Sequence, residues 1–325
     1  MKITRSASLP AAALSALALL AACSVSAAPD ETAPAADPVT VDNCGFSVSV
    51  EEPPERIVTI KSTSTELVLA LGLGDRLVGT AFPDGPLPEG LAEPDPAPPV
   101  LSQKAPGSEA VLAVEPDLVF AGWESNFTSE TAGEREELAD LGIATYVAPP
   151  ACQEPEYQPD PLTFDHIFDY LTETGALLGA TDAAAELVAE QRSALAAIEP
   201  STEGLTALWY SSGSDIPFVG GGIGAPQLLM DTAGLRNINE EVEDTWASVA
   251  WEVIADHDPD VIVLVDSEWN SAEHKIDVLE SHPVTASMTA VAQSRYLTVP
   301  FPASEAGVRS VDAAASLTEQ LEEME

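Results

Sequence analysis

A run of four hydroxyl side chains follows one of the chain's few lysines, Lys61. The four residues are Ser62, Thr63, Ser64 and Thr65. The apolar segment 57–60 before them predicts a strand, and a helix starting after it would direct free N–H groups outward. Such a helix end suits a phosphate or carboxylate, and Lys61 would add positive charge. The alternative is plain helix capping, with Thr63 and Glu66 at the spacing of a capping box.

Aromatic side chains near the ends of predicted strands form a second group of candidates. In α/β lobes, ligands lie beyond the carboxyl ends of the strands, and flat ligands are held by aromatic walls. Ser211, Ser212 and the glycines 220–222 are expected in loops of the same cleft. For each aromatic residue the alternative is packing inside a lobe, and we expect about two of four to touch a ligand. The four are Trp123, Tyr210, Trp246 and Trp269.

Charge and motif content argue against several functional classes. The 325 residues include 12 Lys and Arg against 54 Asp and Glu, a net charge of −42. Nucleic-acid binding requires clustered cations and is therefore disfavoured. The four histidines share no metal-ligand spacing, no serine-hydrolase motif occurs, and the glycines 220–224 do not complete a dinucleotide-binding pattern. We predict a protein without catalysis, cofactor or metal site.

The N-terminus predicts export. Lys2 and Arg5 precede the apolar run Leu9–Leu20, which has the length of a signal-peptide core and is too short to span a membrane. The run ends in a sequence that resembles the lipobox of bacterial lipoproteins, Leu20-Ala21-Ala22-Cys23. This resemblance implies cleavage of residues 1–22, lipid on Cys23 and anchoring to the membrane outside the cytoplasm. An ordinary secretory signal is the alternative.

Residues 23–43, rich in Ala, Pro and acidic side chains, predict a flexible tether. Besides the lipidated cysteine the chain has only Cys44 and Cys152. Outside the cytoplasm two remaining cysteines favour a disulfide, and two free buried thiols are the alternative.

Beyond the tether, short apolar runs alternate with amphipathic stretches, as in parallel α/β units. Predicted strands cover residues 57–60, 76–79, 117–121, 144–148, 206–210, 261–265 and 296–299. Between the two sets of strands, apolar residues at helical spacing continue to Pro200, although Gly175 and Gly179 could interrupt them.

We therefore predict an α/β fold of two Rossmann-like lobes, residues 44–162 and 200–325, with a ligand cleft between them. One long, rigid linker helix over residues 163–199 would join the lobes. A continuous helix of about 35 residues would span about 50 Å, which is hard to reconcile with a single doubly wound sheet.

A short motif occurs once in each predicted lobe. Glu109 stands seven residues before Pro116-Asp117, which starts a strand, and Glu252 stands seven residues before Pro259-Asp260, which starts another. Pro-Asp is a common turn between helix and strand, so one match could be chance. The matched glutamates make chance a weaker explanation.

These two motifs, with the helical stretch between them, resemble the class III substrate-binding proteins of ABC importers. The resemblance covers residues 58–321 and extends to the helix start at Gly307-Val308-Arg309. It implies two lobes around a rigid helix, a small ligand such as a siderophore, haem or cobalamin, and a monomer that docks on a permease dimer. By motif, Glu109 and Glu252 match the glutamates that dock into arginine pockets of the permease.

Within that family, the segment Thr59–Glu66 resembles the branch proposed to carry a deazaflavin coenzyme (F-420 type) precursor with a ribityl-phospholactate tail. The residues agree with such a ligand in type, because Lys61 and the four hydroxyls at a helix start suit an anionic tail and aromatic residues suit a flat ring. A ferric siderophore, haem or cobalamin is the alternative ligand. A surface scaffold lipoprotein and a secreted hydrolase are more distant alternatives.

Overall fold

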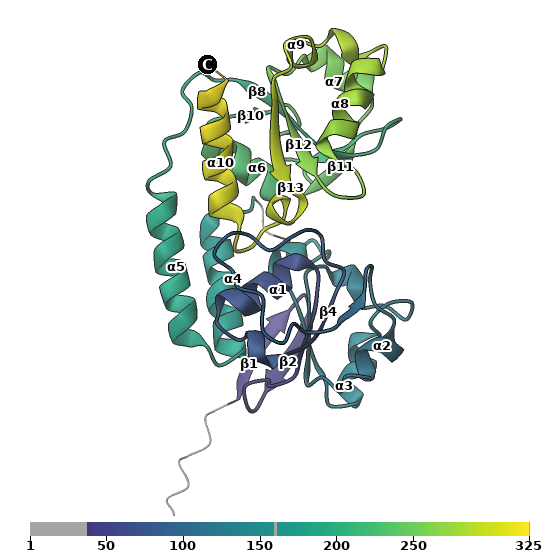
Figure 1. Ribbon diagram of the computed structural model, residues 1–325, viewed down its shortest axis with the longest axis vertical. Coiled ribbons are helices and arrows are strands. Elements are labelled where there is room, and N and C mark those ends of the chain that lie inside the picture. Colours follow the sequence, from purple (N-terminus) through teal and green to yellow (C-terminus); the bar gives the residue numbers. More distant parts are fainter. Residues whose placement is uncertain (1–37, 159–160, 325) are drawn as a thin grey trace, which may run out of the picture. The chain divides into compact units, whose positions relative to one another are not determined.

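The computed structural model describes residues 38–158 and 161–324. In this part of the chain two separate sheets, each with helices packed against it, form two α/β lobes (Figure 1). The N-terminal sheet has the strand order β5-β4-β3-β6-β7, and all its pairings are parallel. Its strands are β3 (Ile57–Ile60), β4 (Leu77–Ala81), β5 (Val100–Ser102), β6 (Leu118–Ala121) and β7 (Ala144–Val147).

The C-terminal sheet has the order β11-β9-β8-β12-β13, with β10 paired to β8. Strands β8, β12, β13 and β10 pair in parallel, whereas β9 and β11 extend the sheet as antiparallel strands. The strands are β8 (Thr206–Ser212), β9 (Phe218–Gly220), β10 (Arg236–Asn237), β11 (Trp246–Ser248), β12 (Val261–Asp266) and β13 (Tyr296–Pro300).

Eight helices of the described chain belong to these two lobes. In the N-terminal lobe they are α1 (Ser62–Ala70), α2 (Ser108–Leu112) and α3 (Arg135–Asp140). In the C-terminal lobe they are α6 (Ala225–Ala233), α7 (Trp251–His257), α8 (Ala272–Ser281), α9 (Thr289–Ala292) and α10 (Ser310–Glu323). Every residue of β3 and β6 is buried, because helices or loops cover both faces of a parallel sheet. The predicted two-lobe α/β fold is confirmed.

The aspartates of the two repeated Pro-Asp turns make equivalent hydrogen bonds in the two lobes. The Asp117 carboxylate accepts hydrogen bonds from the backbone N–H groups of Glu55 (2.8 Å) and Arg56 (3.0 Å), just before β3. The Asp260 carboxylate accepts from the backbone N–H and hydroxyl of Thr206, both at 2.8 Å, at the start of β8. These bonds lower the pKa of Asp260. Each turn thus fixes one parallel strand against its neighbour.

The prediction of a single linker helix over residues 163–199 is wrong. Two helices occupy this stretch, α4 (Phe164–Leu177) and α5 (Thr181–Leu195), and they lie side by side (Figure 1). The chain reverses at Gly179, whose φ of +68° is the left-handed conformation that glycine adopts readily. Gly175 permits the close contact, because a Cβ there would lie 2.2 Å from the Ala184 side chain.

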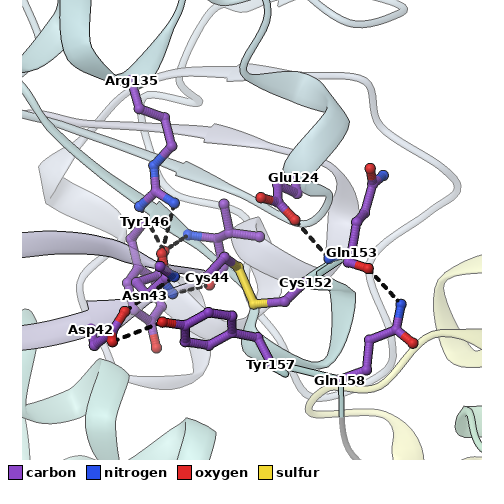
Figure 2. Close-up of a disulfide and its surroundings, with 12 residues drawn as sticks. Asp42, Asn43, Cys44, Glu124, Arg135, Tyr146, Cys152, Gln153, Tyr157 and Gln158 are labelled. Carbon is purple, nitrogen blue, oxygen red and sulfur yellow. Dashed lines mark hydrogen bonds between the residues drawn. A yellow bond between two sulfur atoms is a disulfide. The ribbon is translucent and has the colours of Figure 1, made fainter. Parts of the chain in front are cut away.

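The predicted tether also ends earlier than expected. Residues Val39–Asn43 form strand β1, which pairs with β2 (Phe46–Val50) in an antiparallel hairpin. Hydrogen bonds of the Asn43 side chain to the backbone of Val147, both 2.8 Å, attach this hairpin to β7. Arg135 donates to the Asn43 carbonyl oxygen at 2.8 Å and so secures it from the other side (Figure 2).

The predicted disulfide is confirmed: Cys44, in the turn of the hairpin, is bonded to Cys152 (Figure 2). The signal peptide of residues 1–22 and the lipid site Cys23 lie outside the described residues. None of the helices in the described part of the chain combines the length and apolar character needed to cross a lipid bilayer.

The contact between α4 and α5 generates a stability prediction. Gly175→Ala should lower the free energy of unfolding by about 1–3 kcal/mol, because overpacking outweighs the better helix propensity of alanine. The double variant Gly175→Ala/Ala184→Gly removes the added clash and should be more stable than the sum of the two single changes. Urea denaturation of the four proteins measures the coupling, and strictly additive effects would contradict this packing.

Candidate functional site

A cavity of about 640 Å³ lies where the carboxyl ends of strands from both sheets converge. Its wall includes residues that follow β3, β4, β6 and β7 in one lobe and β8, β12 and β13 in the other. The ligand cleft was predicted at this edge of the strands. Six of the predicted ligand-binding residues line the cavity: Thr63, Trp123, Ser211, Ser212, Trp246 and Trp269.

Aromatic rings form two groups in this wall. In the first, Phe301 meets Trp123 and Trp269 edge-on at centroid distances of 6.4 and 5.1 Å, and Phe82 meets Trp123 at 5.6 Å. In the second, Phe218 and Trp246 are stacked at 5.7 Å with 14° between their planes. Trp269 is 56% exposed and lines the cavity, so its ring is available for contact with a ligand.

Lys61 does not offer a free cation to this cavity, contrary to the expectation. Its side chain is fully buried, and its ammonium donates a hydrogen bond to Asp84 at 2.7 Å. The same ammonium lies 3.5 Å from the Trp123 ring centroid and 4.5 Å from that of Phe301. Burial raises the pKa of Asp84, while the charge of Lys61 opposes the rise. Lys61 is therefore a structural cation beneath the aromatic wall.

The N-terminus of α1 is likewise occupied by the protein's own carboxylate. Asp84 accepts a hydrogen bond from the backbone N–H of Ser62 at 3.1 Å, and the Ser62 hydroxyl accepts from the Asp84 N–H at 2.8 Å. The Ser64 hydroxyl donates to the Ile60 carbonyl at 3.1 Å, and Thr65 bonds Thr59 at 2.7 Å. The predicted phosphate site at this helix end is thus filled internally.

Glu66 does not form the predicted capping box. Its carboxylate accepts hydrogen bonds from both Nε (2.7 Å) and Nη2 of Arg309. Arg309 is the residue that directly precedes α10. Burial raises the pKa of Glu66, and the Arg309 guanidinium opposes that rise. A two-bond pair of this kind is geometrically demanding, and it joins the first helix of one lobe to the last helix of the other.

Glu305 is an ionisable residue of the cavity wall that the sequence did not single out. Its Oε1 atom accepts a hydrogen bond from the Trp123 indole N–H at 2.6 Å and lies 3.6 Å from the Lys61 ammonium. Burial, helped by the negative charge of Asp84, raises the pKa of Glu305 to about 7, although Lys61 acts in the opposite direction.

Tyr210 was predicted to contact ligand, but it does not line the cavity. Its hydroxyl donates to the Gly213 carbonyl at 2.9 Å, and its ring packs edge-on against Trp251 at 5.1 Å. The side chain is 1% exposed because β8 is buried on this face. Alternate residues of a strand point to opposite faces, so a position near a strand end was insufficient to place it.

The two predicted docking glutamates lie at equivalent places. Glu109 is in the first turn of α2 and Glu252 is in the first turn of α7, so each lobe carries one. Both side chains are exposed. The repeat in the sequence is therefore a repeat in the structure, while the docking role itself stays a prediction.

Sequence reasoning missed part of the aromatic wall. Phe82 directly follows β4, and Phe301 directly follows β13. The rule that selected Trp123 would have selected both of them. Phe218 had no such signal, because it begins the antiparallel strand β9. Within residues 38–158 and 161–324, no cluster of His, Cys, Asp or Glu side chains has the arrangement of a metal site.

Comparison with known proteins agrees with this architecture. A model of the periplasmic binding protein family matches residues 57–303. The chain belongs to the periplasmic binding protein family. An uncharacterised ABC transporter substrate-binding lipoprotein of Bacillus subtilis is 24% identical, over 87% of this chain and 85% of its own length.

Two solved members of similar fold cover nearly the same part of the chain. A periplasmic binding protein of Veillonella parvula is 25% identical with a TM-score of 0.76, covering 87% of this chain and 97% of that one. A protein described as an ABC-type Fe3+-hydroxamate transport system, from Saccharomonospora viridis, is 27% identical with a TM-score of 0.73. That match covers 88% of this chain and 99% of the other.

The raised pKa of Glu305 predicts how stability depends on pH. The pKa is about 7 in the folded protein against an ordinary value of 4.5, so folding favours the protonated form. Its contribution is therefore fully present below pH 4.5 and is lost as the pH rises through 7. Because glutamine cannot ionise, Glu305→Gln should have a higher Tm than wild type at pH 8. At pH 5 the Tm values of the two proteins should differ little.

Thermal melting at both pH values measures this effect. The matched control is Glu268→Gln, which removes an exposed carboxylate beside Trp269 and should leave the pH dependence unchanged. Equal loss of Tm between pH 5 and pH 8 in wild type and Glu305→Gln would show that Glu305 does not titrate in this range.

Proposed function

We propose that this protein is the lipid-anchored, substrate-binding component of an ABC importer, and that its ligand carries a flat ring system. The family and the ABC transporter lipoprotein among its relatives support the transport role. The lipobox-like sequence ending at Cys23 supports the anchor. One observation carries the ligand class: two groups of aromatic rings line a single cavity of about 640 Å³. Such walls bind flat, apolar surfaces.

A deazaflavin coenzyme precursor is the first ligand to test. Its ring would contact the tryptophans, and its hydroxyl-bearing tail would meet polar groups such as Ser211, Ser212 and Ser125. Lys61 is engaged by Asp84, and no Lys or Arg occurs among the described residues that line the cavity. We therefore propose that recognition rests on the ring rather than on the phosphate of the tail.

A ferric hydroxamate siderophore is the second candidate, because a structural relative is described as part of an Fe3+-hydroxamate transport system. Hydroxamate complexes need no iron ligand from the protein. Haem normally takes an axial His, Met, Tyr or free Cys ligand. The described wall residues include none of these, since Cys152 is in the disulfide. The described wall therefore favours a deazaflavin or a siderophore over haem.

The exposed Trp269 permits a direct test of ring binding. Trp269→Ala should weaken binding of the deazaflavin riboside by about 3- to 10-fold, the loss expected for one aromatic contact. The fold is expected to persist, because the side chain is 56% exposed. Fluorescence titration gives the Kd of both proteins.

Leu141→Ala is the control, since Leu141 is 62% exposed and does not line the cavity. Tight binding of a ferric hydroxamate with no binding of the deazaflavin would replace the first ligand by the second. Absence of binding to any ligand would favour a scaffold lipoprotein. Turnover of a ligand would favour the hydrolase.

We further propose that Glu109 and Glu252 dock on the permease. Their exposure and their equivalent positions on the two lobes support this role. Two carboxylates at a fixed separation can select the register of a symmetric partner that presents arginines. Neither residue lines the cavity, so docking and ligand binding should be separable.

Glu109→Gln and Glu252→Gln should each reduce uptake into cells that carry the cognate permease, and the double change should reduce it further. Ligand affinity should stay within about twofold of wild type, because neither side chain reaches the cavity. Glu273→Gln is a matched control, since Glu273 is also exposed in the first turn of a helix, α8. Normal uptake by the double variant would refute the docking role.

A further inference from the structure

Trp269 lies at the tip of the short connection between β12 and α8. Ser267 and Asn270 form an antiparallel bridge that closes a turn, with Glu268 and Trp269 between them. The Trp269 ring is 56% exposed and lines the cavity, and it packs edge-on against Phe301 at a centroid distance of 5.1 Å. A side chain that is more than half exposed receives limited support from its neighbours. The backbone of the turn must therefore set much of the position of the ring.

The hydrogen bonds within the turn are long. The Asn270 N–H donates to the Ser267 carbonyl at 3.2 Å, and the Ser267 hydroxyl donates to the Asn270 carbonyl at 3.2 Å. The usual lengths are about 2.9 Å for N–H···O and about 2.8 Å for O–H···O bonds. Beyond the turn, the Asp266 carboxylate accepts from the Ala272 N–H at 2.7 Å, at the start of α8. The turn itself therefore needs further support if its tip is to stay in place.

Lys275 supplies this support from inside the lobe. Its side chain is fully buried, and its ammonium donates to the Asn270 carbonyl at 2.6 Å and to the Val265 carbonyl at 2.5 Å. Side chains of a helix lean toward its N-terminus, so Lys275 in α8 reaches back to the end of β12. The ammonium thus bonds the chain on both sides of Trp269.

Burial of the charge makes this contact hard to replace. An ammonium that has been removed from water is stable only where acceptors meet it, and the acceptors of Lys275 are two backbone carbonyl oxygens. Burial lowers the pKa of Lys275 to about 8, whereas the negative charge of Asp266 raises it. The group is therefore mostly charged at neutral pH. Without a donor at this position, both carbonyl oxygens would lose a charge-assisted hydrogen bond.

We propose that Lys275 is a positioning residue for the ligand: its ammonium fixes the turn of residues 267–270 and so holds the Trp269 ring against the bound ring system. This inference rests on the proposed ring-binding function, and it adds a residue outside the cavity on which affinity depends. Lys275 does not line the cavity, so it acts through Trp269. A ring that is held in place before binding loses little freedom on contact, and this preorganisation increases affinity.

The test is a double-variant cycle on Lys275 and Trp269. Lys275→Met keeps a long, unbranched side chain without a donor, and it should weaken binding of the deazaflavin riboside by about 3-fold or more. The loss should not exceed that of Trp269→Ala, because the ring carries the whole effect. In the Trp269→Ala background, Lys275→Met should change the Kd by less than about 1.5-fold. Fluorescence titration at pH 6.5, where the ammonium is charged, gives the Kd of each protein.

A second variant keeps the test decisive if Lys275→Met does not fold. Ser267→Ala removes the hydroxyl that donates to the Asn270 carbonyl and leaves the ammonium in place. It should weaken riboside binding by about 2- to 3-fold, and this loss should also disappear in the Trp269→Ala background.

Gly175→Ala is the control for stability. It is expected to lower the free energy of unfolding at the contact between α4 and α5, which does not involve the turn. Its Kd for the riboside should therefore equal that of wild type. Thermal melting of all variants shows whether each of them is folded under the conditions of the titration.

The outcomes separate this inference from the function on which it rests. If folded Lys275→Met binds as tightly as wild type, or if Ser267→Ala does so when Lys275→Met does not fold, the positioning role is refuted and ring binding survives. Equal losses with and without the Trp269 ring would show that Lys275 acts by another route. An equal loss in Gly175→Ala would assign the effect to stability. If wild type does not bind the riboside, the proposed ring ligand falls and this inference falls with it.

Discussion

The burial of one ammonium group organises the floor of the cavity. The Lys61 side chain is fully buried, so its charge must find partners within the protein. Asp84 and Phe82 come from the loop after β4, Trp123 from the loop after β6, and Phe301 and Glu305 from the segment after β13. A single charge thus draws together loops from both lobes. The directly bonded, fully buried pair is Lys61 with Asp84, and removing one partner of such a pair typically costs about 3–5 kcal/mol.

Much of the fold could be predicted because the signals are local. Strand β6 and the first five residues of β12 are continuous apolar runs, and β3 is apolar except for Thr59, as expected when both faces of a sheet are covered. The linker was misread because a helical hairpin and a straight helix have the same apolar spacing. Only the conformation of Gly179 and the contact of Gly175 with Ala184 distinguish the two, and neither is visible in periodicity.

The site was predicted less well because its polar contacts join distant residues. Arg309 and Glu66 are 243 residues apart, and Trp123 and Glu305 are 182 residues apart. The sequence pattern predicts helix starts near Glu66 and Arg309, but it does not show which distant residue each side chain contacts. The expectation that Lys61 offers its charge to a ligand was wrong for a related reason, because its partner Asp84 is not evident from the sequence. In this acidic chain Lys61, Lys275, Arg135 and Arg309 are all buried, each bonded to internal oxygen atoms, so scarce positive charge serves the interior rather than ligand capture.

The disulfide connects the N-terminal hairpin to the wall of the cavity. Cys44 lies in the hairpin where the chain enters the folded body, whereas Ala151, Cys152 and Gln153 belong to the cavity wall. A covalent bond is far stiffer than the hydrogen bonds around it. Tension applied to the chain ahead of β1 would therefore be transmitted through the hairpin and the sulfur bridge directly to that wall. Mechanically, the first strand of the described chain and the cavity wall are linked by one covalent connection.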